Sequence, residues 1–125
     1  MKIVIGGYAQ GKLNYILQKY DSSIILDGAL PSKIENKEKQ LIINHFHHWV
    51  KGSILQGGSP EEEIMQFLEQ YPDCIIISDE IGNGIVPIDA REREYRERTG
   101  RILIQLAARA EEVERVICGI GQKIK

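Results

Sequence analysis

A glycine-rich segment near the amino-terminus has the residue types of a phosphate-binding loop. Gly6 and Gly11 bracket four residues and Lys12 follows them, as in the pattern G-x-x-x-x-G-K-[ST]. Glycines let the backbone wrap closely, so that several N–H groups point at phosphate oxygens, while the lysine reaches the outer phosphates. A glycine turn that binds nothing is the alternative. The predicted nucleotide-binding residues are Gly6, Gly7, Tyr8, Ala9, Gln10, Gly11, Lys12 and Leu13.

The last position of this pattern departs from its usual chemistry. Leu13 stands where a serine or threonine hydroxyl normally binds Mg²⁺. Leucine has no oxygen to offer a metal ion, although the backbone and Lys12 can still hold phosphate. We therefore expect phosphate binding to be retained and metal-assisted phosphoryl transfer to be weakened.

Carboxylates follow two of the apolar runs. Asp79 and Glu80 come directly after residues 74–77, and such a pair suits metal binding or the orientation of an attacking hydroxyl. Together with Lys12 they are the predicted catalytic residues, although a polar strand end in solvent is the alternative. Asp27 precedes Gly28, and Asp-Gly is also a common turn. No firm metal site is predicted, and Glu80 and Asp27 are the candidates for Mg²⁺.

Basic residues gather in two further places. Arg93, Arg96 and Arg101 are candidates to contact phosphate or a neighbouring subunit. Glutamates alternate with them, so a solvated helix face with i,i+4 ion pairs is the alternative. Three histidines, His45, His47 and His48, lack the further ligands that a zinc site needs. A histidine nucleophile is conceivable, but partly buried helix residues are the favoured interpretation.

The spacing of apolar residues predicts an alternation of strands and helices. Runs without alternation at 2–5, 23–26, 74–77 and 113–118 are typical of buried parallel strands. Helical spacing predicts helices over 13–20, from 31 to about 55, over 60–71 and over 89–112. Ser32 and Glu35 have capping-box spacing, and Leu41 and Ile42 would lie on the apolar face of the second helix. The sequence therefore predicts an α/β fold with a mainly parallel sheet covered on both faces, and a ligand site at the carboxyl ends of its strands.

Length and composition favour one soluble domain over residues 1–125. The net charge of −2 provides no basic field that would attract nucleic acid or a membrane surface. We find no apolar run long enough to span a bilayer and no signal peptide, so we expect a cytoplasmic location. Cys74 and Cys118 lie in apolar runs and are expected to be small buried hydrophobic residues.

The carboxy-terminal part of the chain resembles the CobU family, the adenosylcobinamide kinases and adenosylcobinamide-phosphate guanylyltransferases. The resemblance lies in residues 77–87 (ISDEIGNGIVP), in Arg93, and in residues 95–97, 100–101, 106–108, 112–113 and 119–125. It implies a three-layer P-loop fold of the RecA-like kind, self-association, and GTP or ATP as phosphoryl donor. It also implies phosphorylation of the aminopropanol hydroxyl of adenosylcobinamide, followed by GMP transfer through a guanylylated histidine.

The chain departs from the family pattern in several positions. Ala9, Gln10 and Leu13 replace Arg, Ser and Ser of the family's loop, and residues 103–104 (LI) replace an Asn-Gln pair. The chain is also shorter than the family's usual length, the difference falling between the loop and Trp49. In one alignment, residues 49–55 match the family's Trp-Val-Ser-Asn-Leu-Leu segment and the histidine region is missing. In the other, residues 43–49 are a remnant of the histidine helix, so that His45, His47 or His48 could correspond to that histidine.

We prefer the first alignment, which predicts a kinase without the guanylyltransferase step. Its partners would be a nucleotide and a corrinoid, and it would form a homo-oligomer. A non-catalytic paralogue that binds nucleotide or corrinoid is the alternative, and a P-loop hydrolase of unrelated role is a third reading.

Overall fold

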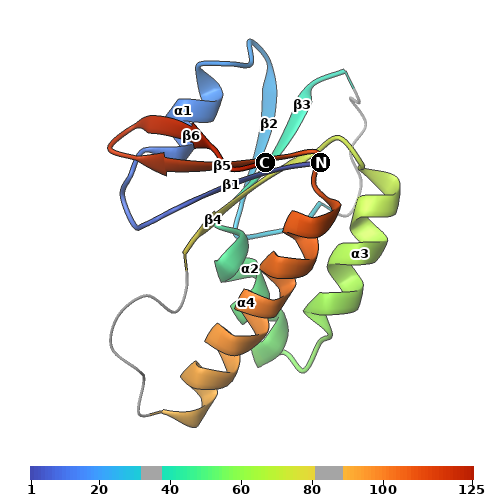
Figure 1. Ribbon diagram of the computed structural model, residues 1–125. Coiled ribbons are helices and arrows are strands. Elements are labelled where there is room, and N and C mark those ends of the chain that lie inside the picture. The colour runs from blue at the N-terminus through green and yellow to red at the C-terminus, as the bar shows by residue number, and fades with distance from the viewer. Residues whose placement is uncertain (32–37, 81–88) are drawn as a thin grey trace.

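A computed structural model describes residues 1–31, 38–80 and 89–125, and its strands form a single sheet (Figure 1). The strand order is β2-β3-β4-β1-β5-β6, and every neighbouring pair is parallel except β5 and β6. The predicted mainly parallel sheet is confirmed. The strands are β1 (Lys2–Gly6), β2 (Ser23–Asp27), β3 (Gln40–Asn44), β4 (Ile75–Asp79), β5 (Glu112–Ile117) and β6 (Ile120–Lys123).

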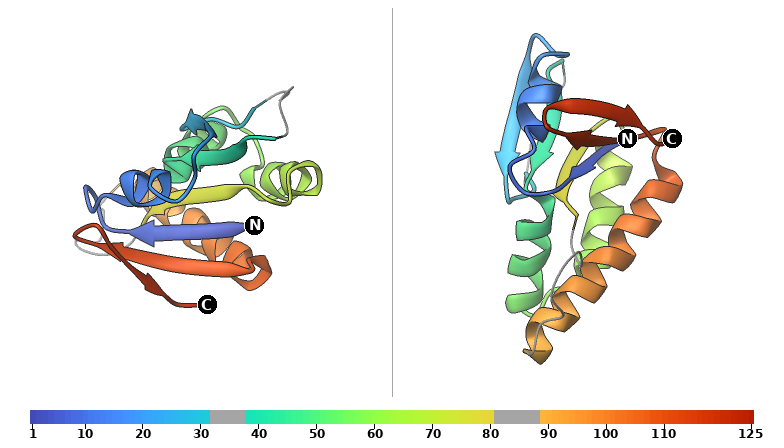
Figure 2. Two further views of the ribbon diagram at one scale, coloured as in Figure 1. Left: turned by 90° about the horizontal axis from the view of Figure 1, so that it is seen from above. Right: turned by 60° about the vertical axis from the view of Figure 1, so that its left-hand side comes forward.

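Helices cover both faces of this sheet, which gives three layers. The helix α1 (Lys12–Leu17) lies on one face, and α2 (Phe46–Leu55), α3 (Pro60–Gln70) and α4 (Ala90–Arg109) lie together on the other (Figures 1 and 2). Successive side chains of a strand point to opposite faces, so strands buried on both sides are apolar throughout. On β4, Ile76 packs toward α2–α4, whereas Ile75 and Ile77 pack toward α1. The described helices include none that is sufficiently long and apolar to cross a membrane.

The helix predicted from residue 31 to about 55 is wrong over its middle part. Residues 40–44 form β3, and the helix begins only at Phe46. Leu41, Ile42 and Ile43 are all buried, and a run of this kind fits a helical stripe and a buried strand equally well. His45 has a left-handed backbone, with φ 51°, which separates the strand from the helix. The predicted cap at Ser32 and Glu35 lies outside the described residues.

A hairpin at the carboxyl end was also missed, because β6 is short and mostly exposed. Two residues separate the paired Ile117 and Ile120, and these residues, Cys118 and Gly119, have φ of 51° and 75°. Positive φ at both central residues is what a tight hairpin requires. The expectation that Cys118 is buried is wrong, because it lies exposed in this turn. Cys74 is buried as predicted, and burial raises the pKa of its thiol to about 12.

A buried carboxylate fastens α1 to the sheet. Glu114 on β5 accepts a hydrogen bond from the hydroxyl of Tyr15 and forms ion pairs with Lys2 and Lys19. Burial opposes ionisation of this carboxyl, but the hydrogen bonds from Lys2 and Tyr15 and the two lysine charges outweigh it. The pKa of Glu114 is lowered from 4.5 to about 2. The ionised side chain is therefore part of the folded state at neutral pH.

Replacing Glu114 by glutamine is expected to lower the free energy of unfolding by about 3 kcal/mol at pH 7. Because its pKa is lower in the folded state, the carboxylate stabilises the protein above about pH 4.5, and this contribution disappears between pH 4.5 and about 2. Urea denaturation at several pH values measures the difference between the two proteins, which should shrink as the pH falls.

Glu112→Gln is the matched control, since Glu112 is exposed on the same strand and also pairs with Lys2. We expect it to change stability by less than about 1 kcal/mol. An equal effect of both substitutions, or a difference for Glu114→Gln that persists unchanged at pH 2.5, would contradict this assignment.

Candidate functional site

The predicted phosphate-binding loop connects β1 to α1 and opens onto a cavity. Gly11 precedes the helix with φ 82°, and Ala9 also has a positive φ of 56°. These left-handed residues turn the chain sharply between strand and helix. The cavity has a volume of about 340 Å³ and is lined by residues 8–14 together with Asn44, His45 and Asp79. Gly6 ends β1, and Gly7 contributes a carbonyl to the site.

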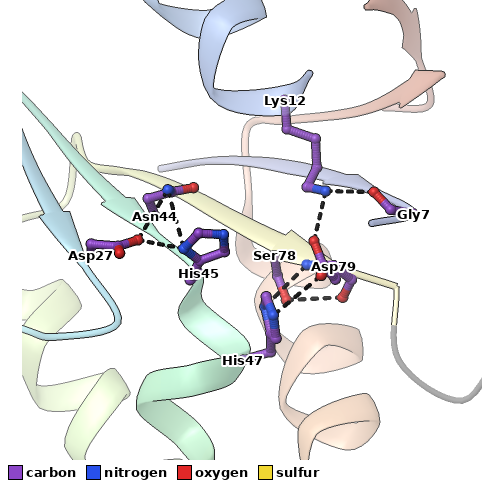
Figure 3. A network of polar contacts seen from close by, with 8 residues as sticks. All are labelled: Gly7, Lys12, Asp27, Asn44, His45, His47, Ser78 and Asp79. Carbon is purple, nitrogen blue, oxygen red and sulfur yellow. Dashed lines mark hydrogen bonds and ion pairs between the residues drawn. The ribbon is translucent and has the colours of Figure 1, made fainter. Parts of the chain in front are cut away.

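Lys12 is the central cation of this cavity. Its side chain is buried, and its Nζ lies 2.7 Å from Asp79 Oδ1 and donates to the Gly7 carbonyl at 2.7 Å (Figure 3). An ammonium group has three N–H donors, so among the described residues one of them is left for a ligand. The predicted juxtaposition of Lys12 and Asp79 is therefore present in the structure.

The carboxy-terminal hairpin holds the loop from outside. Gln10 accepts a hydrogen bond from the Cys118 N–H on its side-chain oxygen, at 2.7 Å. Its carbonyl accepts from the Gly119 N–H at 2.8 Å. Gly119 is thus in contact with the loop.

The two carboxylates predicted to act as a pair are separated. Asp79 faces the loop cavity, whereas Glu80 pairs with Arg115, with 2.7 Å between Oε1 and Nε, and lines a different cavity beside α4. Neighbouring residues at the end of an extended strand point to opposite faces, and adjacency in sequence therefore works against a shared site. The structure brings Asp79 to Lys12 and does not bring Glu80 there.

Asp27 meets two residues that the sequence analysis did not place in the site. Asn44 Nδ2 donates to Asp27 Oδ1 at 3.1 Å, and His45 Nδ1 contacts the same oxygen (Figure 3). Asn44 and His45 line the loop cavity as well. Their position at and just after the end of a strand could have indicated them, but the helical spacing of the apolar residues conceals that strand.

The three histidines are close together but do not share one helix face. His45 precedes α2, while His47 is buried and both of its ring nitrogens face Asp79. His48 is exposed, and its ring centroid lies 4.9 Å from that of His45. Within residues 1–31, 38–80 and 89–125, no group of three or more His, Cys, Asp or Glu side chains could hold a metal ion. His45 thus lies outside the helix, although its ring stacks on that of His48.

The predicted arginine contacts lie elsewhere on the molecule. Arg93, Arg96 and Arg101 belong to α4, on the face of the sheet opposite to α1, and none lines the loop cavity. Arg96 Nε lies 3.9 Å from Glu92, and an Arg101 nitrogen lies 2.9 Å from Glu97. These are i,i+4 pairs on a helix surface, the alternative that the sequence left open. Contact with a neighbouring subunit remains a prediction.

The sheet order, the flanking helices and the loop between the first strand and the first helix define an α/β protein with a P-loop-like fold. A family model described as CobU, cobinamide kinase / cobinamide phosphate guanyltransferase, matches residues 17–124. The chain belongs to the CobU family. The match begins after the P-loop, so the assignment of that loop depends on its residues and geometry.

Two curated relatives are similar to part of the chain. The bifunctional adenosylcobalamin biosynthesis protein CobU of Escherichia coli (strain K12) is 47% identical over 51 residues, 41% of this chain and 28% of that protein. The protein of the same description from Salmonella typhimurium (strain LT2) is 45% identical over 69 residues, 52% of this chain and 38% of that protein. The aligned segments thus cover well under half of either relative.

Proposed function

We propose that this chain binds GTP or ATP at the P-loop and transfers the terminal phosphoryl group to the hydroxyl of adenosylcobinamide. Membership of the CobU family supports a role in cobalamin biosynthesis. The observation that carries the nucleotide part is the buried Lys12, which Asp79 and the Gly7 carbonyl hold at the edge of the loop cavity. A corrinoid is the proposed acceptor because the family description names cobinamide.

The proposed reaction is a displacement at the terminal phosphorus. The acceptor oxygen forms a bond to that phosphorus, the bond to the bridging oxygen breaks, and the acceptor hydroxyl loses its proton. The nucleoside diphosphate leaves. Lys12 and the loop N–H groups would hold the phosphates and neutralise their charge, which is most of what such a transfer requires of a protein. Asp79 fixes the position of Lys12, and Asn44 and His45 also line the cavity.

The candidate residues for Mg²⁺ do not form a metal site in this structure. Leu13 lacks the hydroxyl, Glu80 pairs with Arg115, and Asp27 is held by Asn44 and His45. Among the described residues that line the cavity, Asp79 is the one carboxylate. We therefore assign no step of the reaction to a protein-bound metal ion.

We do not include guanylyl transfer in the proposal. Under the alignment that places Trp49 in the Trp-Val-Ser-Asn-Leu-Leu segment, the family's histidine region has no counterpart. The competing alignment requires residues 43–49 to be a helix remnant, but Ile43 and Asn44 belong to β3. This favours the first alignment. Self-association and the arginine contacts stay predictions of the family resemblance.

Thermal unfolding with GTP or ATP, with and without Mg²⁺, tests the binding part. A ligand at a hundred times its dissociation constant stabilises the native state by about 2.7 kcal/mol, which corresponds to a rise in Tm of about 10 °C for a chain of this size. Transfer of labelled phosphate to adenosylcobinamide tests the chemistry. No rise in Tm with any purine nucleotide would refute the proposal.

A non-catalytic nucleotide- or corrinoid-binding protein is the second candidate, and Leu13 favours it. The Leu13 side chain packs against the apolar cluster under α1 in place of presenting a hydroxyl. The transfer assay should therefore include Leu13→Ser, with Leu17→Ser as the control that removes a similar apolar side chain from the same helix. A rise of about tenfold with Leu13→Ser alone, equivalent to about 1.4 kcal/mol in the barrier, indicates a weakened kinase. Absence of transfer by both the natural chain and Leu13→Ser indicates a binding protein.

A further inference from the structure

His47 directs both of its ring nitrogens to a single residue. It lies at the start of α2 with 5% of its surface exposed. The Asp79 N–H donates to His47 Nδ1 at 3.2 Å, and His47 Nε2 lies 3.3 Å from Asp79 Oδ2 (Figure 3). Since Nδ1 accepts a hydrogen bond, the ring proton of the neutral imidazole is assigned to Nε2, the nitrogen that faces Asp79 Oδ2.

The ring is neutral in this position. Burial lowers the pKa of His47 to about 4, although the charge of Asp79 opposes the shift. A neutral donor leaves the negative charge of Asp79 to interact with Lys12, whereas a second cation would compete for it. The carboxylate is thus divided between two partners, with Oδ2 on the histidine and Oδ1 on the lysine.

The contact between His47 and Asp79 also bears on the position of Lys12. A lysine side chain has many rotamers and loses entropy when it is fixed. Two of its three N–H donors are taken by Asp79 and by the Gly7 carbonyl, both at 2.7 Å, which orients the third. A side chain that is already oriented loses less conformational entropy when it binds its ligand.

We propose that His47 is a positioning residue of the nucleotide site: it holds the Asp79 carboxylate so that Lys12 is oriented toward the phosphates. His47 itself does not line the loop cavity and acts only through Asp79. This inference rests on the proposed function for its effect on nucleotide binding. The arrangement of the three side chains is a property of the free protein and can be tested without a ligand.

The test compares His47→Leu with His47→Gln. Glutamine places an N–H donor at a reach similar to that of Nε2, whereas leucine fills space without donating. We expect His47→Leu to weaken binding of GTP about fivefold to tenfold by calorimetry, and His47→Gln to stay within about twofold of the natural chain. In an Asp79→Ala background, His47→Leu should have no further effect, because two residues that act as one unit are not additive. His48→Leu is the control, since His48 is exposed and adjacent.

NMR of the ligand-free protein separates this inference from the proposed function. Nitrogen shifts of His47 should show a proton on Nε2 and none on Nδ1 at pH 7. The Lys12 ammonium signal, slowed in exchange by its two partners, should persist in His47→Gln and be lost in His47→Leu. If GTP does not bind the natural chain, the proposed function fails and the NMR result still decides the role of His47.

The inference is overturned if Lys12 is equally ordered in His47→Leu, or if leucine and glutamine weaken GTP binding to the same extent. A loss that persists undiminished in the Asp79→Ala background also overturns it. Urea denaturation of each variant shows whether the protein is folded at the assay temperature, and the NMR arm applies to every folded variant.

Discussion

Replacing Lys12 by methionine is expected to lower the affinity for GTP or ATP by about one hundredfold. Methionine keeps the unbranched chain that runs beside Gly6 but carries no charge and no donor. Hydrogen bonds between charged groups are worth about 1.5–3 kcal/mol each, so loss of this ammonium removes the largest single contribution we assign to the protein. Isothermal titration calorimetry of the two proteins measures the change directly.

The same substitution leaves Asp79 without its cation, so a loss of stability must be separated from a loss of binding. We expect the free energy of unfolding to fall as well, because a mostly buried carboxylate loses its partner. Binding is therefore measured at a temperature at which the variant is folded. Lys51→Met removes a surface lysine that pairs with Glu92, and it should leave affinity unchanged. Nucleotide binding by Lys12→Met at the natural affinity would remove Lys12 from the site.

Substituting alanine for Gly6 is expected to destabilise the protein by about 2–4 kcal/mol. A Cβ at this position would lie 2.5 Å from the Val116 carbonyl oxygen and 3.3 Å from Lys12 Cδ. The first contact is with the backbone of the neighbouring strand, so relief requires β1 and β5 to separate. Overpacking of this kind costs about 1–3 kcal/mol and occasionally more. Equilibrium unfolding in urea gives the value.

Gly7→Ala is the matched control, one residue further along the same loop. Its Cβ would meet only Gln10 Cγ, at 3.7 Å, which is an ordinary contact. We expect the free energy of unfolding to change by no more than about 0.5 kcal/mol. If the two alanine variants were equally stable, the close approach of β1 to β5 at Gly6 would not be a real constraint on the fold.

The parts of the site that were predictable are those whose signal is local. The loop pattern around Lys12 consists of consecutive residues, and the apolar run before Asp79 predicts a buried strand. The placement of Lys12 and Asp79 at the same edge of the sheet then follows from the rule that ligands meet the carboxyl ends of parallel strands.

The parts that were missed depend on which face of the sheet a side chain occupies, or on a single residue with a left-handed backbone. A one-residue step sends Asp79 and Glu80 to opposite faces of the sheet, which a motif read along the sequence does not resolve. The left-handed residue His45 follows a strand in the middle of a segment, residues 31–55, whose apolar spacing predicts one long helix. Because β3 was not predicted, the places of Asn44 and His45 in the site were not predicted. The contact of His47 with Asp79 was missed for the same reason.

The hydrogen bond between Gln10 and Cys118, in the turn between β5 and β6, joins positions 108 residues apart in the chain. Because the ribosome builds a chain from its amino-terminus, the loop that carries Lys12 is made before the turn at residues 118–119 that supports it from outside. Contacts between distant positions form late, because the intervening chain must first be ordered. A nascent chain would therefore carry the complete loop sequence before the turn that holds it has been made, and the cavity would acquire its shape only as the sheet closes.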